Sequence, residues 1–544
     1  MEIFKRTLAI LLAIFLLAAT TGCSTGSESP VTTSGDSSTS ASTPLNVWAI
    51  ESPSITDYET NAQSVWMEDQ TGVEINWLAV PQHGWYDAFK SSVMSGEKVD
   101  IYLYPFSTSE VEVLAGMSYL TPLEDLINEE NTPNLAAILE ANPELKQLIT
   151  APDGHIYTLF SNNVYNQTAY TQKLWVNRAF LETYIAETDA DMPETTAEFK
   201  EMLVYFNTHD MNKNGQQDEI AYMGQSGVEG LYNLFGSFIP SNSSGSGFGC
   251  YTTDSGEISF AYREEAFKEA LSYVQSLYSE GVIHADTFTI TTKELYNYTS
   301  GDAASVRVGV VAGASIENIV QLTEGDNAID YDDYIALPPM AGPNGIRSIM
   351  TTGETTVELR NAITAQCSDP EAAIKWLDAG YSEAARMFAV YGGLENENWK
   401  YAQGETINGA GQVITALTQT EENSSWRGQG IVYSITEEDY RMMDITQLAT
   451  NAALANYKAN LSYRPYAVLN NWPPIVWAGE NADAAAEYSE INGLLQQTVT
   501  NYYTEVVLGK KNLTSDWDAY TQEIAEIGAD RFIELVQLYV SAGS

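Results

Sequence analysis

The chain has 544 residues, of which 44% are hydrophobic. This length and composition indicate a globular protein with two or more lobes rather than a disordered chain. It carries 73 acidic and 25 basic residues, a net charge of −48. A surface this acidic repels phosphate backbones, which excludes nucleic acid as a partner; we expect a soluble monomer that concentrates divalent cations near its surface.

The first 22 residues predict a lipoprotein signal peptide. A positive start is followed by an apolar run over 8–19, which is shorter than the ~20 residues that a membrane span needs. Thr21-Gly22-Cys23 has the pattern of a lipoprotein cleavage site with lipid on Cys23, although Thr20 stands where such signals usually carry Leu. Residues 23–44, rich in Ser, Thr, Gly and Pro, predict a flexible tether.

Strands and helices alternate after the tether. The hydrophobic patterns predict strands at 45–51, 73–80 and 99–104, with helices at 55–70 and 85–94. Short links between them indicate a parallel sheet covered by helices on both faces. Because such sheets bind ligands at the carboxyl ends of their strands, we expect ligand contacts along one rim from Trp48, Glu51, Trp85, Tyr86 and Tyr104.

A polar segment at 161–172 predicts the crossing into a second lobe. The second lobe then begins with a strand at 173–177 and a helix that starts after Pro193, where Thr195 or Thr196 caps the helix and Glu198 completes a capping box. A buried strand at 307–312 is expected to return toward the first lobe.

The stretch from Asp210 to Glu219 predicts a calcium site. Alternating oxygen-bearing side chains around a sharp turn at Gly215 suit a hard cation that takes six to eight oxygens. The twelfth position of an EF-hand loop, usually a bidentate Glu, is Ala221, so Glu219 is expected to close the site. The alternative is a plain Asn/Gly-rich surface turn. The predicted metal ligands are Asp210, Asn212, Asn214, Gln216, Asp218 and Glu219.

The later part of the chain predicts helices at 262–280, 370–389 and 482–542, the last broken near Gly509 and Trp517. Residues 241–249 contain G-x-G-x-G but lack the flanking strand and helix of a phosphate-binding loop, so we interpret them as a mobile loop. Cys250 and Cys367 lack metal-ligand spacing and are expected to be two buried thiols, with a single disulfide as the alternative.

The aromatic residues favour sugar binding. There are 33 Tyr and 11 Trp but only 16 Phe, and rings with a polar edge suit partly wet surfaces. Sugar C–H faces stack on such rings while sugar hydroxyls bond to polar side chains. Trp66, Trp376 and Trp517 lie among apolar neighbours and are expected in the core. The candidates for stacking lie in polar loops: Trp85, Tyr86, Trp399, Trp426 and Trp472.

No sequence motif indicates catalysis. The four His residues form no pair with metal-ligand spacing, and H-E-x-x-H, G-x-S-x-G and G-x-x-x-x-G-K-[ST] are missing from the sequence. The separation of a glycosidase carboxylate pair is invisible in a sequence. We therefore expect a binding protein rather than an enzyme.

The segment from Lys173 to Tyr222 resembles family 1 extracellular solute-binding proteins of ABC importers, in their oligosaccharide-binding branch. A strand with W-x-N, a helix start with P-x-T-x-x-E and a D-x-N-x-N-G-x-x-D-E calcium loop occur here in that order. Two further stretches agree, 122–126 leading to 151–157 and 378–382 leading to 391–395.

This resemblance implies a two-lobed, type II periplasmic-binding-protein-like α/β fold with a hinge. The expected lobes are 45–165 completed by roughly 312–395, and 166–311 completed by roughly 396–480, followed by C-terminal helices at 481–544. The lobes would close on an oligosaccharide and present it to an ABC permease. The lipid on Cys23 would hold the protein outside the cytoplasm at the membrane, and structural calcium would stiffen one lobe.

Three other readings stay open at this point. One is a secreted glycan-active enzyme, a hydrolase or a lyase. The second is a binding protein of the same architecture for peptides or another solute, and the third is a surface adhesin.

Overall fold

The computed structural model describes most of the chain beyond the tether. The described residues are 43–51, 55–82, 84–163, 170, 173–224, 231–240, 248–253, 255–351, 356–418, 423–426, 436–469 and 482–542. The predicted signal peptide, the predicted lipidation site Cys23 and the sugar-stacking candidate Trp472 lie outside these residues.

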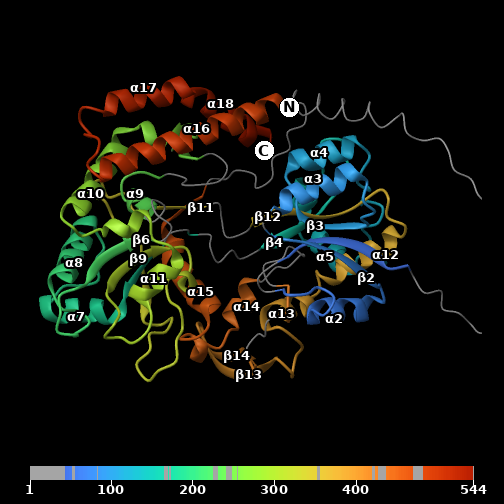
Figure 1. Ribbon diagram of the computed structural model, residues 1–544, viewed down its shortest axis with the longest axis horizontal. Coiled ribbons are helices and arrows are strands. Elements are labelled where there is room, and N and C mark those ends of the chain that lie inside the picture. Colours follow the sequence, from blue (N-terminus) through green and yellow to red (C-terminus); the bar gives the residue numbers. More distant parts are fainter. Residues whose placement is uncertain are drawn as a thin grey trace, which may run out of the picture. The chain divides into compact units, whose positions relative to one another are not determined.

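The first of two larger sheets is built mainly from the N-terminal part of the chain (Figure 1). Its strand order is β2-β1-β3-β12-β4. β1 pairs in parallel with both β2 and β3, which confirms the predicted parallel arrangement. β12 pairs antiparallel with β3 and β4. The strands are β1 (Leu45–Ile50), β2 (Ile75–Val80), β3 (Ile101–Pro105), β12 (Thr356–Ile363) and β4 (Leu159–Asn163).

Helices cover both faces of this sheet, as predicted. On one face Trp48 of β1 contacts Phe89 of α3, and on the other Trp77 of β2 packs against Trp376 of α12. The helices are α2 (Ala62–Thr71), α3 (Trp85–Ser95), α4 (Thr108–Gly116), α5 (Pro133–Ala141), α6 (Pro143–Ile149), α12 (Pro370–Ala379) and α13 (Glu383–Tyr391).

Two of these helices differ from the expected ranges because capping side chains divide the chain. α2 begins only at Ala62, since the Asn61 side chain accepts hydrogen bonds from the backbone N–H groups of Gln63 and Ser64. The helix predicted over 370–389 is two helices, because Ser382 caps a new helix by accepting from the Ala385 N–H.

The second sheet has the order β10-β5-β9-β6. Its strands are β10 (Tyr334–Leu337), β5 (Lys173–Asn177), β9 (Val308–Gly313) and β6 (Ile220–Gly224). The expectation that β9 returns toward the first lobe is wrong: β9 lies between β5 and β6 and is buried along its whole length. β10 also belongs to this sheet, although it lies within the range 312–395 predicted for the first lobe. The chain rejoins the first sheet at β12.

Helices pack on both faces of the second sheet as well, around two separate hydrophobic clusters. The predicted capping box is present at the start of α8, with Thr195 and Glu198 bonding reciprocally. The C-terminal helices pack into the larger cluster together with α10, and Gly528, with φ of +113°, separates the last two. The helices are α7 (Arg178–Thr188), α8 (Thr196–Thr208), α9 (Tyr232–Phe235), α10 (Glu265–Ser279), α11 (Thr292–Thr299), α15 (Ala452–Tyr463), α16 (Ala482–Val507), α17 (Trp517–Ile527) and α18 (Ala529–Ala542).

Smaller elements complete the described structure. β13 (Trp399–Thr406) and β14 (Gly409–Ala416) form a hairpin, β11 (Ile349–Thr351) pairs in parallel with β15 (Ala467–Leu469), and β7 (Cys250–Thr252) pairs with β8 (Ile258–Phe260). The short helix α14 spans Glu437–Arg441. Cys250 and Cys367 are both free; Cys250 is buried as expected, but Cys367 is only half-buried.

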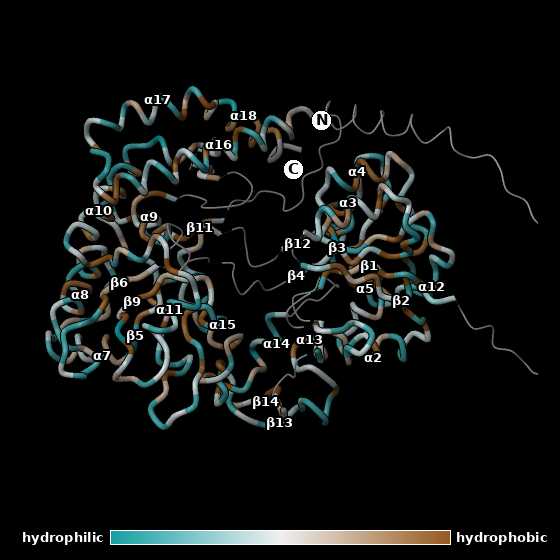
Figure 2. The backbone as a smooth tube through the Cα atoms, in the orientation of Figure 1, coloured by the Kyte–Doolittle hydropathy of each residue, from teal (hydrophilic) through white to brown (hydrophobic). Residues whose placement is uncertain are grey.

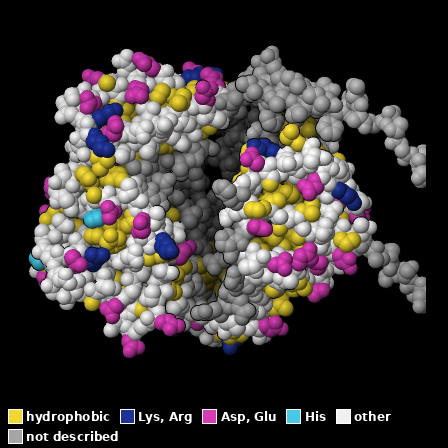
Figure 3. All heavy atoms as spheres, in the orientation of Figure 1, with side chains coloured by type: hydrophobic (Ala, Val, Ile, Leu, Met, Phe, Trp, Pro, Cys, Tyr) yellow, Lys and Arg dark blue, Asp and Glu magenta, His cyan; other side chains and the backbone are white. Residues whose placement is uncertain are grey.

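The distribution of side chains is that of an α/β protein with two lobes. Hydrophobic residues concentrate on the strands of the two large sheets (Figure 2), and acidic side chains outnumber basic ones on the face shown in Figure 3. None of the helices in the described ranges has both the length and the apolar content that a membrane span requires.

Candidate functional site

The rim of the first sheet retains three of the predicted ligand residues in accessible positions. Glu51 follows the carboxyl end of β1, and its backbone N–H donates to the Val80 carbonyl at the end of β2 over 2.8 Å. Trp85 opens α3 and is half-buried, with its ring centroid 5.7 Å from that of Tyr86. Tyr86 is 46% exposed and carries the Lys90 ammonium 4.5 Å above its ring. These side chains can offer an aromatic face and a carboxylate to a polar ligand.

Trp48 and Tyr104 belong to the core beneath this rim rather than to its surface. Each is 1% exposed. Successive side chains of a strand point to opposite faces, so a residue near a strand end can still face a covering helix. The Tyr104 hydroxyl donates to Glu110, and its ring supports that of Trp85 at 5.4 Å. Both residues are buried, contrary to the expected ligand contacts, and Tyr104 supports Trp85 from the core.

Trp426 is likewise an anchor and not an open stacking surface. It is 4% exposed and is surrounded by Tyr58, Trp77 and Trp376. Its backbone N–H donates to Gln63 Oε1 at 2.9 Å, and its indole N–H donates to Ser64 Oγ at 2.8 Å. Trp426 therefore hydrogen-bonds to polar side chains at the start of α2 while its ring packs in the core.

Trp399 is buried in the same way. It is 6% exposed, lies against Tyr391 and Tyr401, and donates its indole N–H to the Gly393 carbonyl. A polar neighbourhood in the sequence does not reveal in which direction a loop ring points, which explains both corrections.

The rim of the second sheet contains polar residues that the sequence reasoning missed. The carboxyl ends of β9 and β6 lie at the same edge as the start of β5, since Lys173 pairs with Gly313 and Gly224 with Ala312. Lys173 is fully buried and its Nζ donates to the Ala314 carbonyl at 2.8 Å. Burial lowers the pKa of Lys173 to about 7, with the charge of Glu317 opposing the shift. The only sequence signal was a lysine heading an apolar strand.

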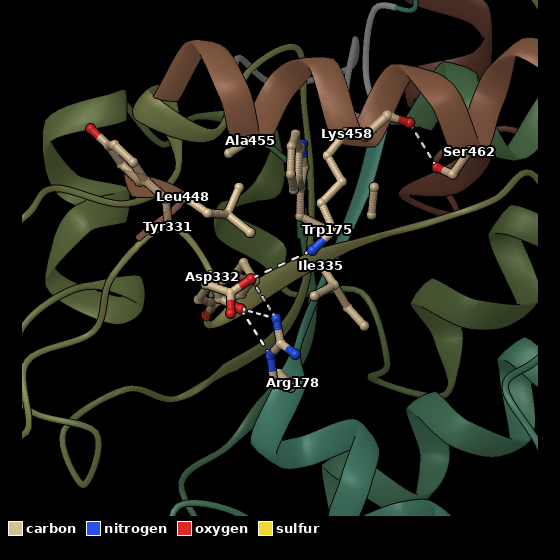
Figure 4. Close-up of a pocket in the computed structure, with 12 residues that line it drawn as sticks. Trp175, Arg178, Tyr331, Asp332, Ile335, Leu448, Ala455, Lys458 and Ser462 are labelled. Atoms are coloured by element: carbon tan, nitrogen blue, oxygen red, sulfur yellow. Dashed lines mark hydrogen bonds and ion pairs between the residues drawn. The ribbon is translucent and has the colours of Figure 1, made fainter. Parts of the chain in front are cut away.

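A cavity of about 300 Å³ lies on the α15 face of the second sheet (Figure 4). Its polar side is formed by Asp332, which binds Arg178 Nη2 at 2.7 Å and lies 3.7 Å from Lys458 Nζ. Arg178 also donates to the Asp332 backbone carbonyl from Nε and Nη2. Arg178 follows the carboxyl end of β5, so the cavity extends toward the sheet edge opposite Lys173.

The Asp210–Glu219 loop is folded as a compact turn held by its own side chains. Gly215 adopts φ of +84°, which permits the turn. Asp210 accepts from the N–H groups of Asn214 and Gly215, and Glu219 Oε1 accepts from the Met211 N–H at 2.7 Å. The loop is thus folded around its own carboxylate and amide oxygens, and both carboxylates at its ends are turned inward.

One carboxylate oxygen of this loop is buried without a hydrogen-bond donor. Glu219 is only 8% exposed, and its Oε2 is buried without a hydrogen-bond partner. A buried carboxylate oxygen without a donor is costly, so a cation is the natural partner. No group of three or more His, Cys, Asp or Glu side chains with metal-binding geometry occurs among the described residues. The loop relies on Asn oxygens alongside its carboxylates, and this oxygen-only donor set fits Ca²⁺.

The chain is similar to known binding proteins along most of its length, although no family model matches it. It is 25% identical over 494 residues to the fructooligosaccharide ABC transporter substrate-binding protein FusA of Streptococcus pneumoniae, covering 87% of this chain and 85% of FusA. It is 23% identical over 455 residues to the lipoprotein LipO of Bacillus subtilis, covering 81% of each.

Solved structures agree with this fold. An EF-hand mutant of FusA in complex with fructo-nystose superimposes with a TM-score of 0.71 at 22% identity, covering 92% of this chain and 99% of FusA. An HMO-binding, ABC-transporter-associated solute-binding protein from Bifidobacterium longum infantis gives a TM-score of 0.71 at 18% identity, with 92% and 99% covered.

The two-lobed fold is shared with solved solute-binding proteins, and over most of its length the sequence is similar to an ABC transporter substrate-binding protein. The resemblance drawn from 173–222 is thereby confirmed at the level of the class. Within that class, the matched proteins named for a ligand are sugar binders.

Proposed function

We propose that this protein captures a neutral oligosaccharide outside the cytoplasm and delivers it to an ABC permease. The observation that carries the proposal is the sequence likeness to FusA, which extends over 87% of the chain and therefore includes both sheets. Glu51, Trp85 and Tyr86 at the rim of the first sheet supply the carboxylate and ring faces that sugar binding uses.

The experiment is calorimetric titration of the purified chain, without its signal peptide, with a panel of trisaccharides. The proposal expects one site per chain and a dissociation constant in the micromolar range or below. Turnover of the sugar during the titration, seen as new reducing ends, would instead indicate a glycan-active enzyme. Binding of peptides with no binding of sugars would move the protein to another solute class.

We further propose that the Asp210–Glu219 loop holds a structural Ca²⁺. The FusA variant solved with fructo-nystose is an EF-hand mutant, which supports a related loop in that protein. Here Asp210, Asn212, Asn214, Asp218 and Glu219, with Gln216 through its backbone, would hold the ion. Bound Ca²⁺ would neutralise the buried Glu219 carboxylate and add its binding free energy to the stability of the second lobe.

The predicted membrane attachment is part of the same proposal. The LipO relative is a lipoprotein, and the Thr21-Gly22-Cys23 pattern agrees with it. Lipid on Cys23, followed by the tether at 23–44, would keep the binding lobes close to a permease. Metabolic labelling with a fatty-acid analogue tests this directly: the wild type should be labelled, and Cys23→Ala should not.

A further inference from the structure

The turn that follows β9, residues 313–318, is fixed by side chains from three other elements. From β5, Trp175 donates its indole N–H to the Gly313 carbonyl at 3.0 Å, and Lys173 donates to the Ala314 carbonyl at 2.8 Å. From α11, the Tyr296 hydroxyl donates to the Glu317 carbonyl at 2.7 Å. This turn lies at the carboxyl end of a parallel strand, where α/β sheets bind ligands.

Helix α15 fixes the same turn from another direction through Asn456, which is fully buried. Asn456 Oδ1 accepts from the Ile316 N–H at 2.9 Å, and its Nδ2 donates to Glu317 Oε2 at 2.8 Å. One amide therefore sets both the backbone of the turn and the orientation of the Glu317 carboxylate. Such support is what a preorganised binding group requires.

One carboxylate oxygen of Glu317, Oε2, accepts a hydrogen bond within the protein, and the other, Oε1, can accept one from a ligand. Its side chain is half-buried, and among the described residues only Asn456 donates to the carboxylate, at Oε2. The Lys173 side chain, which donates to the Ala314 carbonyl of the same turn, interacts electrostatically with Glu317. A carboxylate oxygen held in a fixed direction accepts hydrogen bonds from sugar hydroxyls and repels a ligand carboxylate.

We infer that Glu317 is the second lobe's hydroxyl-accepting group and selects neutral over acidic oligosaccharides, with Asn456 as its positioning residue. This inference rests on the proposed function. It assigns a direct ligand contact to Glu317 alone, through Oε1, while Asn456 acts by holding Oε2.

The test compares Glu317→Gln with wild type by titration with neutral trisaccharides and with a tri-uronate. Removing a charged acceptor should weaken binding of the preferred neutral sugar by about 10-fold or more. The preference for neutral sugar over uronate should fall as well. Glu324→Gln is the matched control, because Glu324 is an exposed acid in the loop after the same turn, and its affinity should equal that of the wild type.

A rescue experiment separates positioning from general damage. Asn456→Asp keeps the acceptor for the Ile316 N–H but places a second carboxylate against Glu317, so affinity should fall. Combining it with Glu317→Gln restores a donor–acceptor pair between the two side chains, and the double variant should bind more tightly than Asn456→Asp alone. A merely structural role for Asn456 predicts that affinity and the free energy of unfolding fall and recover together, whereas positioning predicts a change of affinity at nearly unchanged stability.

The outcomes distinguish the two proposals. If the wild type binds sugar and Glu317→Gln binds it equally well with the same neutral preference, this inference is overturned and the proposed function stands. If the wild type binds no oligosaccharide, the proposed function fails, and the role of Glu317 fails with it.

Discussion

Replacing Trp426 by Ala should destabilise the first lobe and leave sugar affinity nearly unchanged. The ring is 4% exposed and contacts three other aromatic rings, Tyr58, Trp77 and Trp376. Its removal opens a large cavity, for which core Trp→Ala changes cost about 3–5 kcal/mol. Loss of the indole N–H also leaves the buried Ser64 hydroxyl without this donor, adding roughly 1 kcal/mol.

The assay is urea unfolding followed by far-ultraviolet circular dichroism, with titration of sugar under conditions where each variant is folded. Trp426→Ala should lose about 4–6 kcal/mol of unfolding free energy and keep its affinity within about threefold of the wild type. Tyr86→Ala is the opposite control: Tyr86 is 46% exposed, so stability should change by less than about 0.5 kcal/mol. A stable Trp426→Ala variant with a tenfold loss of affinity would refute the anchor role.

Three further predictions concern charge, metal and the first rim. The pKa of Lys173 falls from 10.5 in the unfolded state to about 7 in the folded state, so the unfolded state binds more protons between these values and stability should rise with pH there. In urea titrations between pH 7 and 9, the wild type should gain about 2 kcal/mol of unfolding free energy relative to Lys173→Met. The same dependence of stability on pH in both proteins would contradict this prediction. Chelation of calcium should lower the melting temperature without changing ligand stoichiometry. Glu219→Gln should abolish this fall in melting temperature, and the exposed control variant Glu201→Gln should retain it. A melting temperature of Glu219→Gln that still responds to calcium would argue against this site. Trp85→Ala should weaken sugar binding at least about tenfold while Lys90→Ala does not, and equal affinities would remove Trp85 from the site.

The sequence predicted those features that depend on local pattern. The alternation of strands and helices over 45–104, the Thr195–Glu198 capping box and the folded Asp210–Glu219 loop all follow from residues close together in the chain. The Ca²⁺ assignment of that loop stays a prediction. The likeness across 173–222 also indicated the class correctly.

The failures concern long-range placement. Whether a ring in a polar segment faces solvent or core depends on partners hundreds of residues away, as the bond between Trp426 and Ser64 shows. β9 could not be assigned to its sheet from its own residues, because a fully apolar strand fits the centre of either sheet. Glu317 was missed for the same reason: its orientation comes from Asn456, 139 residues away. Apart from β10, which belongs to the second sheet, the lobe boundaries stay predictions, as does the role of Trp472.

The most direct measurement is calorimetric titration of the purified chain, without residues 1–22, with neutral trisaccharides in the presence of calcium. Saturable binding of one sugar per chain, with no product released, is the expected result. The claim that these two lobes capture an oligosaccharide would be contradicted if the folded chain gave no heat beyond that of dilution with any of the sugars.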